Sequence, residues 1–208
     1  MSAQTGRWVD TVDADEMAAL RERLASAAAD EGLLDVAYRV VDSPHGRLLL
    51  AASDAGVVRV AFAVEDHDRV LDQLASDISA RVLRTPARTE DAARQIDEYF
   101  DGHRRGFDLA LDLRLLSGFR RLVVERLGEI PFGATETYAQ VATRVDNPAA
   151  VRAVGSACSH NPVPIVLPCH RVVRSDGSVG QYLGGTDVKT ALLKMESQRS
   201  TSRHRGER

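Results

Sequence analysis

The sequence is poor in the residues from which metal centres and disulfide frameworks are built. Its 208 residues include two cysteines, Cys158 and Cys169, and one tryptophan. No Cys-X-X-Cys pair and no histidine cluster has the spacing of metal ligands, so we predict no metal and no cofactor. Two isolated cysteines are typical of a reducing compartment, and we expect no structural disulfide between them.

Long apolar runs are missing as well. No segment approaches the ~20 residues of a transmembrane helix, and residues 1–10 lack the basic-then-apolar pattern of a signal peptide. We therefore expect a cytoplasmic protein that makes no membrane contact, and we expect it to act as a monomer. Its apolar and charged fractions, 44% and 27%, are those of an ordinary globular protein with one or two small domains.

The net charge of −3 conceals an asymmetry between the two halves of the chain. Residues 1–113 contain 13 Lys or Arg and 22 Asp or Glu, which gives a net charge of −9. Residues 114–208 contain 14 Lys or Arg and 8 Asp or Glu, which gives a net charge of +6. A basic half favours an anionic partner such as nucleic acid. A solvated basic surface without a partner has the same composition, so charge alone leaves both interpretations open.

An N-terminal extension, residues 1–33, precedes the first domain. We expect residues 1–12 to be disordered. Asp13 and Glu16 have the spacing of a capping box, which predicts a helix from there to about Asp30. This helix carries no chemistry that the sequence reveals, so a packing or interaction role is expected.

Residues 34–113 have the pattern of a small α/β domain. Apolar residues alternate along three short runs separated by turns, which predicts a three-stranded antiparallel meander. The expected strands are 36–40, 47–52 and 57–62, the expected helices 65–80 and 89–100, and the short extended segments 81–84 and 107–113. No polar constellation stands out here, and we predict that this domain supports the other half of the chain.

Residues 114–197 are predicted to form a mainly α-helical domain, followed by a basic, disordered tail at 198–208. The expected helices are 117–127, 135–145, 149–159 and 186–197. The second and third are joined by a short turn containing Pro148, which is the pattern of a helix-turn-helix.

The helix predicted at 149–159 has many small side chains, including Ala153 and Gly155. Small residues allow close approach, either to another helix, which is the commoner reason, or to a groove of DNA. A protein that reads major-groove sequence carries several long polar side chains, but this helix has only Arg152. Contact with a narrow minor groove through the backbone and one arginine fits better.

The segment Pro164–Val173 has the strongest functional pattern. The apolar run 165–167 predicts a buried strand or extended segment that leads into Pro168. Cys169 and His170 follow, and a cysteine held by rigid backbone beside an imidazole is a candidate activated nucleophile. Adjacent side chains of an extended chain point to opposite sides, so we expect a local turn or a bridging water between the two.

A cysteine that only fills the core is the common alternative, but the neighbouring His170 and Arg171 argue against it. Farther along, three glycines surround Tyr182 and allow the backbone to approach a ligand closely, although a flexible loop has the same composition. Glu196 lies near the end of a helix, where the helix dipole disfavours a carboxylate. This position suggests a partner such as His170 or an arginine.

Together these residues resemble those of the O6-alkylguanine-DNA alkyltransferase family, also called methylated-DNA–protein-cysteine methyltransferases. The most specific match is Pro168-Cys169-His170-Arg171-Val172. The other matches are 130–133, Tyr138, 147–148, 152–155, 161–164, 180–185 and Glu196. Residues 34–113 are similar to the family's ribonuclease-H-like domain only in the order of strands and helices, and residues 1–33 have no counterpart in its minimal form.

The resemblance implies DNA repair by direct reversal. Members of the family flip an O6-alkylated guanine out of duplex DNA and transfer the alkyl group irreversibly to a cysteine, here Cys169. By the same resemblance His170 would take the thiol proton through a water, and Glu196 would orient the imidazole. Asn161 would join this network, and Tyr138 would donate a proton to N3 of the leaving guanine.

The resemblance also assigns residues to DNA and to the substrate. Arg152 would fill the gap left by the flipped base, with Ala153, Gly155 and Tyr138 at the DNA. The residues expected to line the substrate pocket are Tyr182, Leu183, Val172 and Gly180. Position 183 is often small or polar in the family, so the range of alkyl groups is left open, as is activity on O4-alkylthymine.

Two other functions compete with alkyl transfer. Lesion-binding proteins of the same superfamily recognise the damaged base without repairing it, but they replace the cysteine, whereas Cys169 is present. A cysteine hydrolase would need a second histidine with an orienting partner, which the sequence does not offer beyond His170 and Glu196. Cys158 lacks an adjacent His-Arg pair and is interpreted as a packing residue.

Overall fold

The computed structural model describes residues 13–204, so our expectation for residues 1–12 falls outside the described part of the chain. The helices are α1 (Ala14–Asp30), α2 (His67–Asp77), α3 (Glu90–Asp101), α4 (Gly118–Leu127), α5 (Tyr138–Arg144), α6 (Val151–Ser159) and α7 (Thr186–His204). The strands are β1 (Val36–Val41), β2 (Leu48–Ser53), β3 (Gly56–Phe62), β4 (Val82–Arg84), β5 (Glu136–Thr137) and β6 (Val172–Val173). Short 3-10 helices are η1 (Ala63–Glu65) and η2 (Cys169–Arg171).

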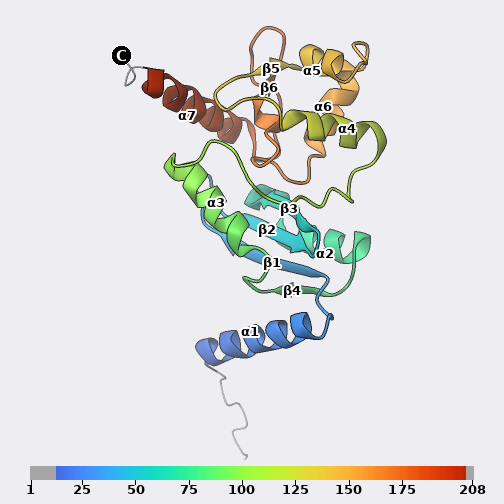
Figure 1. The fold of residues 1–208 in the computed structure, drawn as a ribbon, viewed down its shortest axis with the longest axis vertical. Helices are drawn as coiled ribbons and strands as arrows, with labels where there is room; N and C mark the ends of the chain where they lie inside the picture. Colours follow the sequence, from blue (N-terminus) through green and yellow to red (C-terminus); the bar gives the residue numbers. More distant parts are fainter. Residues whose placement is uncertain (1–12, 205–208) are drawn as a thin grey trace, which may run out of the picture.

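The N-terminal domain is built on a four-stranded sheet in the order β3-β2-β1-β4 (Figure 1). The predicted meander is confirmed, since β1 pairs antiparallel with β2 and β2 with β3, and the short strand β4 adds a parallel pair with β1. The expected extended segment 107–113 forms a connector that touches the sheet through one bridge, Val57 to Leu111. A Cβ on Gly56 would lie 2.3 Å from the Ala110 carbonyl oxygen, so only glycine permits this close approach.

The two faces of the sheet are buried in different ways. One face packs against α2 through a small cluster that includes Leu49, Val58 and Leu74. The other face, with Leu48 and Phe62, belongs to a larger cluster that also contains α3 and the buried residues of the C-terminal domain. The two domains therefore share one hydrophobic core, which fixes their relative position.

In the C-terminal domain α4, α5 and α6 pack against one another (Figure 1). The helix expected from residue 135 begins only at Tyr138, because Glu136 and Thr137 pair as β5 with β6. Thr137 then caps α5: its hydroxyl accepts from the Gln140 N–H at 3.2 Å, and the Gln140 side chain accepts from the Thr137 N–H at 2.7 Å. Similarly, α6 begins at Val151 rather than at 149, after a turn.

The last helix is longer than expected. We predicted a disordered tail from residue 198, but α7 continues to His204. The extension is held in place because Arg199 donates to the carbonyls of Tyr99 and Phe100 at the end of α3, at 3.1 and 2.9 Å. Of the helices between residues 13 and 204, none has both the length and the apolar character needed to span a bilayer.

Candidate active site

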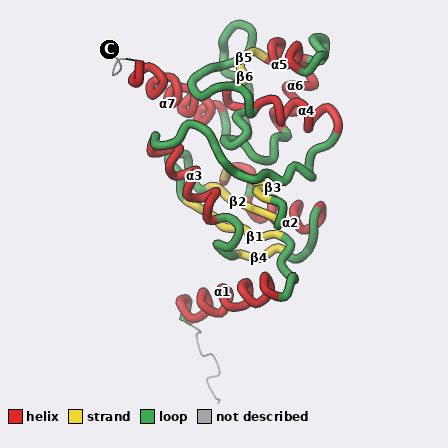
Figure 2. The backbone as a smooth tube through the Cα atoms, in the orientation of Figure 1, coloured by secondary structure: helices red, strands yellow, loops and turns green. Residues whose placement is uncertain are grey.

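The stretch between α6 and α7 is mostly loop (Figure 2), and it holds the cysteine singled out in the sequence. The strand or extended run predicted at 165–167 is wrong, because the chain turns there and Ile165 has a φ of 73°. The turn is closed by the Leu167 N–H, which donates to the Val163 carbonyl at 2.9 Å. Prolines at 162, 164 and 168 have no N–H for a strand ladder, so this apolar run cannot pair as a strand.

The side chain of Asn161 satisfies the backbone groups that a neighbouring strand would otherwise pair with. Its amide donates to the Leu167 carbonyl at 2.7 Å, and its carbonyl accepts from the Val163 N–H at 3.1 Å. The same side chain also lowers the pKa of the Cys169 thiol and so favours its ionised form. Asn161 therefore affects Cys169 rather than His170, and it stabilises the turn that leads into Cys169.

Cys169 is almost fully buried, with 2% of its surface exposed. Burial raises the pKa of its thiol to about 11, although the hydrogen bond from Asn161 and the charge of Lys189 act in the opposite direction. The sulfur is therefore a protonated thiol near neutral pH. A base is needed to produce the reactive thiolate.

His170, the next residue, is the candidate for that base. The expected local turn is present as η2, and it directs the imidazole into the protein, where Nε2 lies 3.0 Å from Glu196 Oε1. A carboxylate only accepts hydrogen bonds, so Nε2 carries the hydrogen and Nδ1 has a free lone pair. Burial lowers the pKa of His170 and keeps it neutral, and within the described residues Nδ1 has no hydrogen-bond partner.

Glu196 has both kinds of partner that its position in the sequence suggested. Besides His170, its carboxylate accepts two hydrogen bonds from Arg171, at 2.9 and 2.8 Å, and one from the Gly133 N–H at 3.1 Å. Burial alone would raise the pKa of Glu196, but the hydrogen bonds and charges of His170 and Arg171 hold it well below its usual range. The carboxylate is thus ionised and fixed.

Two residues of this site were not identified from the sequence. Tyr99, in the N-terminal domain, donates from its hydroxyl to Glu196 at 2.6 Å. Lys189 of α7 is buried, donates to the Val172 carbonyl at 2.6 Å, and is the positive charge that acts on Cys169. The sequence did contain a signal for Lys189. One face of α7 carries Lys189, Leu192 and Glu196 at helical spacing, and two charged residues on a buried face indicate a role beyond hydrophobic packing.

Tyr138 stands at the first position of α5, close to the cysteine turn. A Cβ on Gly180 would lie 2.7 Å from the Tyr138 hydroxyl, so the glycine leaves room for the phenol. Burial, with the nearby Cys158 and Cys169, raises the pKa of Tyr138. The phenol is therefore protonated at neutral pH and can donate. Lys189 Nζ lies 5.8 Å from the centre of its ring.

Of the expected pocket residues, Tyr182 lies beside His170, whereas Leu183 borders a separate hollow. Tyr182 packs edge-on against Phe62 and His170, with ring centres 5.5 and 6.2 Å apart. Its buried hydroxyl finds no hydrogen-bond partner in the part of the chain that the structure covers. Leu183 borders a hollow of about 290 Å³ between the two domains, which is also lined by Leu116 and Pro162.

The residues assigned to DNA lie on the outside. Arg152 and Ala153, in the first turn of α6, are exposed, and Gly155 is half-buried. A Cβ on Gly155 would be 3.9 Å from the Tyr138 ring, so α6 and Tyr138 are neighbours. The structure thus brings together Cys169, His170, Glu196, Asn161 and Tyr138, and leaves Arg152 and Ala153 on the adjoining surface.

Comparisons with known proteins identify the family of the chain. Residues 118–198 match the family model described as "6-O-methylguanine DNA methyltransferase, DNA binding domain", and residues 36–113 match that family's "ribonuclease-like domain". A methylated-DNA–protein-cysteine methyltransferase of Mycolicibacterium paratuberculosis is 39% identical over 165 residues, 79% of this chain and 94% of that protein. One from Methanosarcina barkeri is 38% identical over 159 residues, 76% and 96% of the two chains.

Solved structures give the same result. A crystal structure of Mycobacterium tuberculosis O6-methylguanine methyltransferase has a TM-score of 0.70 and 35% identity, covering 79% of this chain and 94% of that one. A crystal structure of the OGT of that organism in complex with DNA has a TM-score of 0.68 and 35% identity, covering 78% and 94%. With both domains matched and most of the chain covered, the protein belongs to the 6-O-methylguanine DNA methyltransferase family.

Proposed function

We propose that this protein repairs O6-alkylguanine in duplex DNA by transferring the alkyl group to Cys169, once per molecule. The observation that carries the proposal is the arrangement of Cys169 beside a neutral His170 whose imidazole is held by an ionised Glu196. The names of the relatives, and the relative crystallised with DNA, support the same reaction.

The chemistry requires that a proton leave the thiol. Nδ1 of His170 has a free lone pair and takes the Cys169 proton through a bridging water. The sulfur then attacks the alkyl carbon, a C–S bond forms, and the bond between that carbon and O6 breaks. The electron pair of the broken bond goes to the guanine, which leaves as the unmodified base once it is protonated. The thioether has no route back to a thiol, so the protein acts once.

Tyr138 supplies the proton that the leaving base needs. Its raised pKa keeps the phenol protonated, and it delivers a proton to N3 of guanine as negative charge develops there. The proton held by His170 returns to Tyr138 through solvent, so that the thiol hydrogen ends on guanine. Asn161 and Lys189 assist by stabilising the thiolate.

The burial of Cys169 supports base flipping. A cysteine residue that is 2% exposed cannot bring its sulfur to a base that stays stacked in a duplex. The alkylated guanine must therefore leave the helix, which costs a few kcal/mol and less for a damaged pair. Tyr182, Val172, Gly180 and the backbone of Leu183 would line its pocket, and the unpaired hydroxyl of Tyr182 offers a donor to the base.

For DNA contact we infer that α5 and α6 act as a helix-turn-helix in the minor groove. The exposed first turn of α6, with small Ala153 and Gly155, allows close approach to the groove, and Arg152 would fill the gap left by the base. We assign an extension at 1–33, a ribonuclease-H-like supporting domain at 34–113, the alkyltransferase domain at 114–197 and a C-terminal segment at 198–208. We also propose that the protein acts as a monomer.

The test is a titration of a duplex carrying one O6-methylguanine, followed by nucleoside analysis. Loss of the lesion should rise to one equivalent of protein and stop. Cys169→Ala should bind the duplex and remove no lesion, and Cys158→Ala is the matched control that retains the reaction. Turnover beyond one equivalent would argue for a hydrolase, and binding without lesion loss would favour the lesion-binding alternative.

A further inference from the structure

The carboxylate that holds His170 is itself held by the other domain. Tyr99 lies in the last turn of α3, is fully buried, and donates to Glu196 Oε1 at 2.6 Å across 97 positions of sequence. Three rings fix its orientation, those of Phe100, Phe107 and Phe132, with centres 5.4, 5.3 and 6.1 Å away. The hydroxyl therefore has little freedom to leave Glu196.

Arg199, one turn after Glu196 in α7, contacts the same end of α3. Its guanidinium donates to the carbonyls of Tyr99 and Phe100, at 3.1 and 2.9 Å. The last carbonyls of a helix lack partners within the helix and carry partial negative charge, so a guanidinium is a favourable cap. A Cβ on Gly102 would lie 2.8 Å from the guanidinium carbon, so the C-cap glycine leaves the room for this contact.

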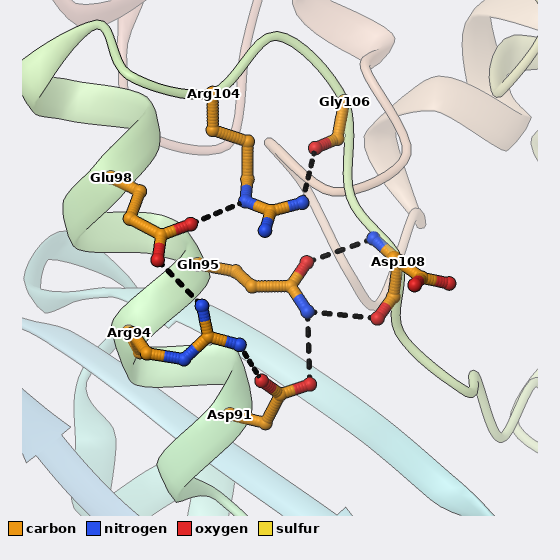
Figure 3. A network of polar contacts seen from close by, with 7 residues as sticks. All are labelled: Asp91, Arg94, Gln95, Glu98, Arg104, Gly106 and Asp108. Carbon is orange, nitrogen blue, oxygen red and sulfur yellow. Dashed lines mark hydrogen bonds and ion pairs between the residues drawn. The ribbon is translucent and has the colours of Figure 1, made fainter.

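Helix α3 is also tied to the connector that follows it (Figure 3). Gln95 pairs with the backbone of Asp108 in both directions, each bond at 2.8 Å, and also donates to Asp91 at 2.9 Å. Arg104 donates to Glu98 at 2.8 Å. These bonds hold α3 in one rotation, so that Tyr99 faces α7.

From these contacts we propose that Tyr99 is a positioning residue for the methyl-transfer reaction, held in place by Arg199, and that it fixes the Glu196 carboxylate for its bond to His170. The inference rests on the proposed function of Cys169. It makes the N-terminal domain part of the catalytic arrangement. It also gives Arg199 a role inside the protein, in place of the nonspecific attraction to phosphate that a basic tail suggests.

The physical reason lies in the oxygen that is shared. Tyr99, His170 and Arg171 all donate to Glu196 Oε1. Without the phenol that oxygen has more negative charge available for the imidazole and more freedom to rotate. The carboxylate would then stabilise protonated His170 better, which raises the pKa of the imidazole and leaves it unable to accept a proton up to a higher pH. The imidazole would also be held less firmly in the orientation needed to accept the Cys169 proton.

The test compares single-turnover methyl transfer by wild type and by Tyr99→Phe across pH. This variant retains the ring and its three aromatic contacts. We expect transfer about threefold to tenfold slower on the pH plateau, the effect of one hydrogen bond, and an acid limb moved to higher pH. The matched control is Tyr38→Phe, in the same domain on the α2 face of the sheet, which should match wild type in both respects.

Arg199→Met gives an independent measurement, with Lys194→Met, an exposed charge on the same helix, as control. We expect Arg199→Met to slow transfer while DNA binding keeps the salt dependence of the Lys194→Met control. A phosphate contact at Arg199 would instead lower the salt slope by about one unit relative to that control.

The outcomes are distinct. If Tyr99→Phe has the wild-type rate and the wild-type pH profile, or loses only thermal stability with an unchanged profile, the proposal is overturned. A lower salt slope for Arg199→Met alone would also contradict it. Failure of the wild-type protein to methylate Cys169 would overturn the proposed function instead, so the two failures are separable.

Discussion

Arg171 and Glu196 form a bidentate ion pair inside the protein, with Nε 2.9 Å from Oε2 and Nη2 2.8 Å from Oε1. Their side chains are 7% and 1% exposed. A third guanidinium nitrogen donates to the Ile130 carbonyl at 2.5 Å. The pair keeps Glu196 ionised next to a neutral imidazole, and this is the condition under which His170 can accept a proton at Nδ1.

Removing the arginine should strongly destabilise the fold. Arg171→Met leaves a buried carboxylate without its main partner, which typically costs about 3–5 kcal/mol of unfolding free energy. Urea unfolding measures the loss. The matched control is Arg121→Met, which breaks an exposed pair with Glu125 and should hardly move the midpoint. If both variants lost the same unfolding free energy, the buried Arg171–Glu196 pair would contribute no more to stability than the exposed pair.

Glu196 should also dominate stability in acid. Its pKa is depressed in the folded protein, so its contribution is complete above the unfolded value of about 4.3 and is lost as pH falls below it toward the folded value. Melting temperatures measured across this range should fall more steeply for wild type than for Glu196→Gln. The exposed pair of Arg126 and Glu129 provides a control, since Glu129→Gln should keep the wild-type slope.

Space beside Tyr138 should matter for the rate of transfer. In Gly180→Ala the new methyl would lie 2.7 Å from the Tyr138 hydroxyl, so the phenol must shift. Under the proposed function Tyr138 donates a proton in the transition state, so displacing it should slow transfer on the order of tenfold to hundredfold, while affinity for unmodified duplex is retained. Gly106→Ala, where a Cβ meets nothing within 4 Å, is the control and should react normally. A normal rate for Gly180→Ala would remove Tyr138 from the mechanism.

Lys189 should tune the thiol. Its charge lowers the pKa of Cys169, so Lys189→Met should raise that pKa further and reduce the thiolate population at a given pH. Each rise of about 1 in the thiol pKa makes that population about tenfold smaller. The pH dependence of Cys169 alkylation by a small soluble electrophile would detect the change, with Lys194→Met for comparison. An unchanged profile would leave Lys189 its hydrogen bond to the Val172 carbonyl and its contact with the Tyr138 ring.

The sequence predicted those parts of the site that depend on local pattern. Cys169 and His170 are adjacent. Glu196 was identified because the helix was expected to end at 197, where the helix dipole disfavours a carboxylate. The partners are present, but the reason was wrong, since α7 runs on to His204. The meander was predictable because alternation and turns are local signals. The starts of α5 and α6 were not, because pairing of β5 with β6 and a turn before Val151 override helix propensity.

What the sequence could not supply were contacts made across the fold. Nothing near Tyr99 indicates a partner 97 residues away, and its pattern in α3 is that of a core aromatic. The run 165–167 looked like a strand because apolar residues suit one. Its turn depends on Asn161, whose side chain replaces strand partners. The continuation of α7 beyond 197 depends likewise on carbonyls of α3.

The most direct measurement starts from reduced protein that has been incubated with duplex DNA carrying O6-methylguanine. The protein is digested, and the masses of its peptides are measured. We predict the added mass of one methyl group, confined to the peptide that contains Cys169 and absent from the peptide that contains Cys158. Unmodified Cys169 in protein that has bound the lesion, or a methyl group on another residue, would contradict this prediction.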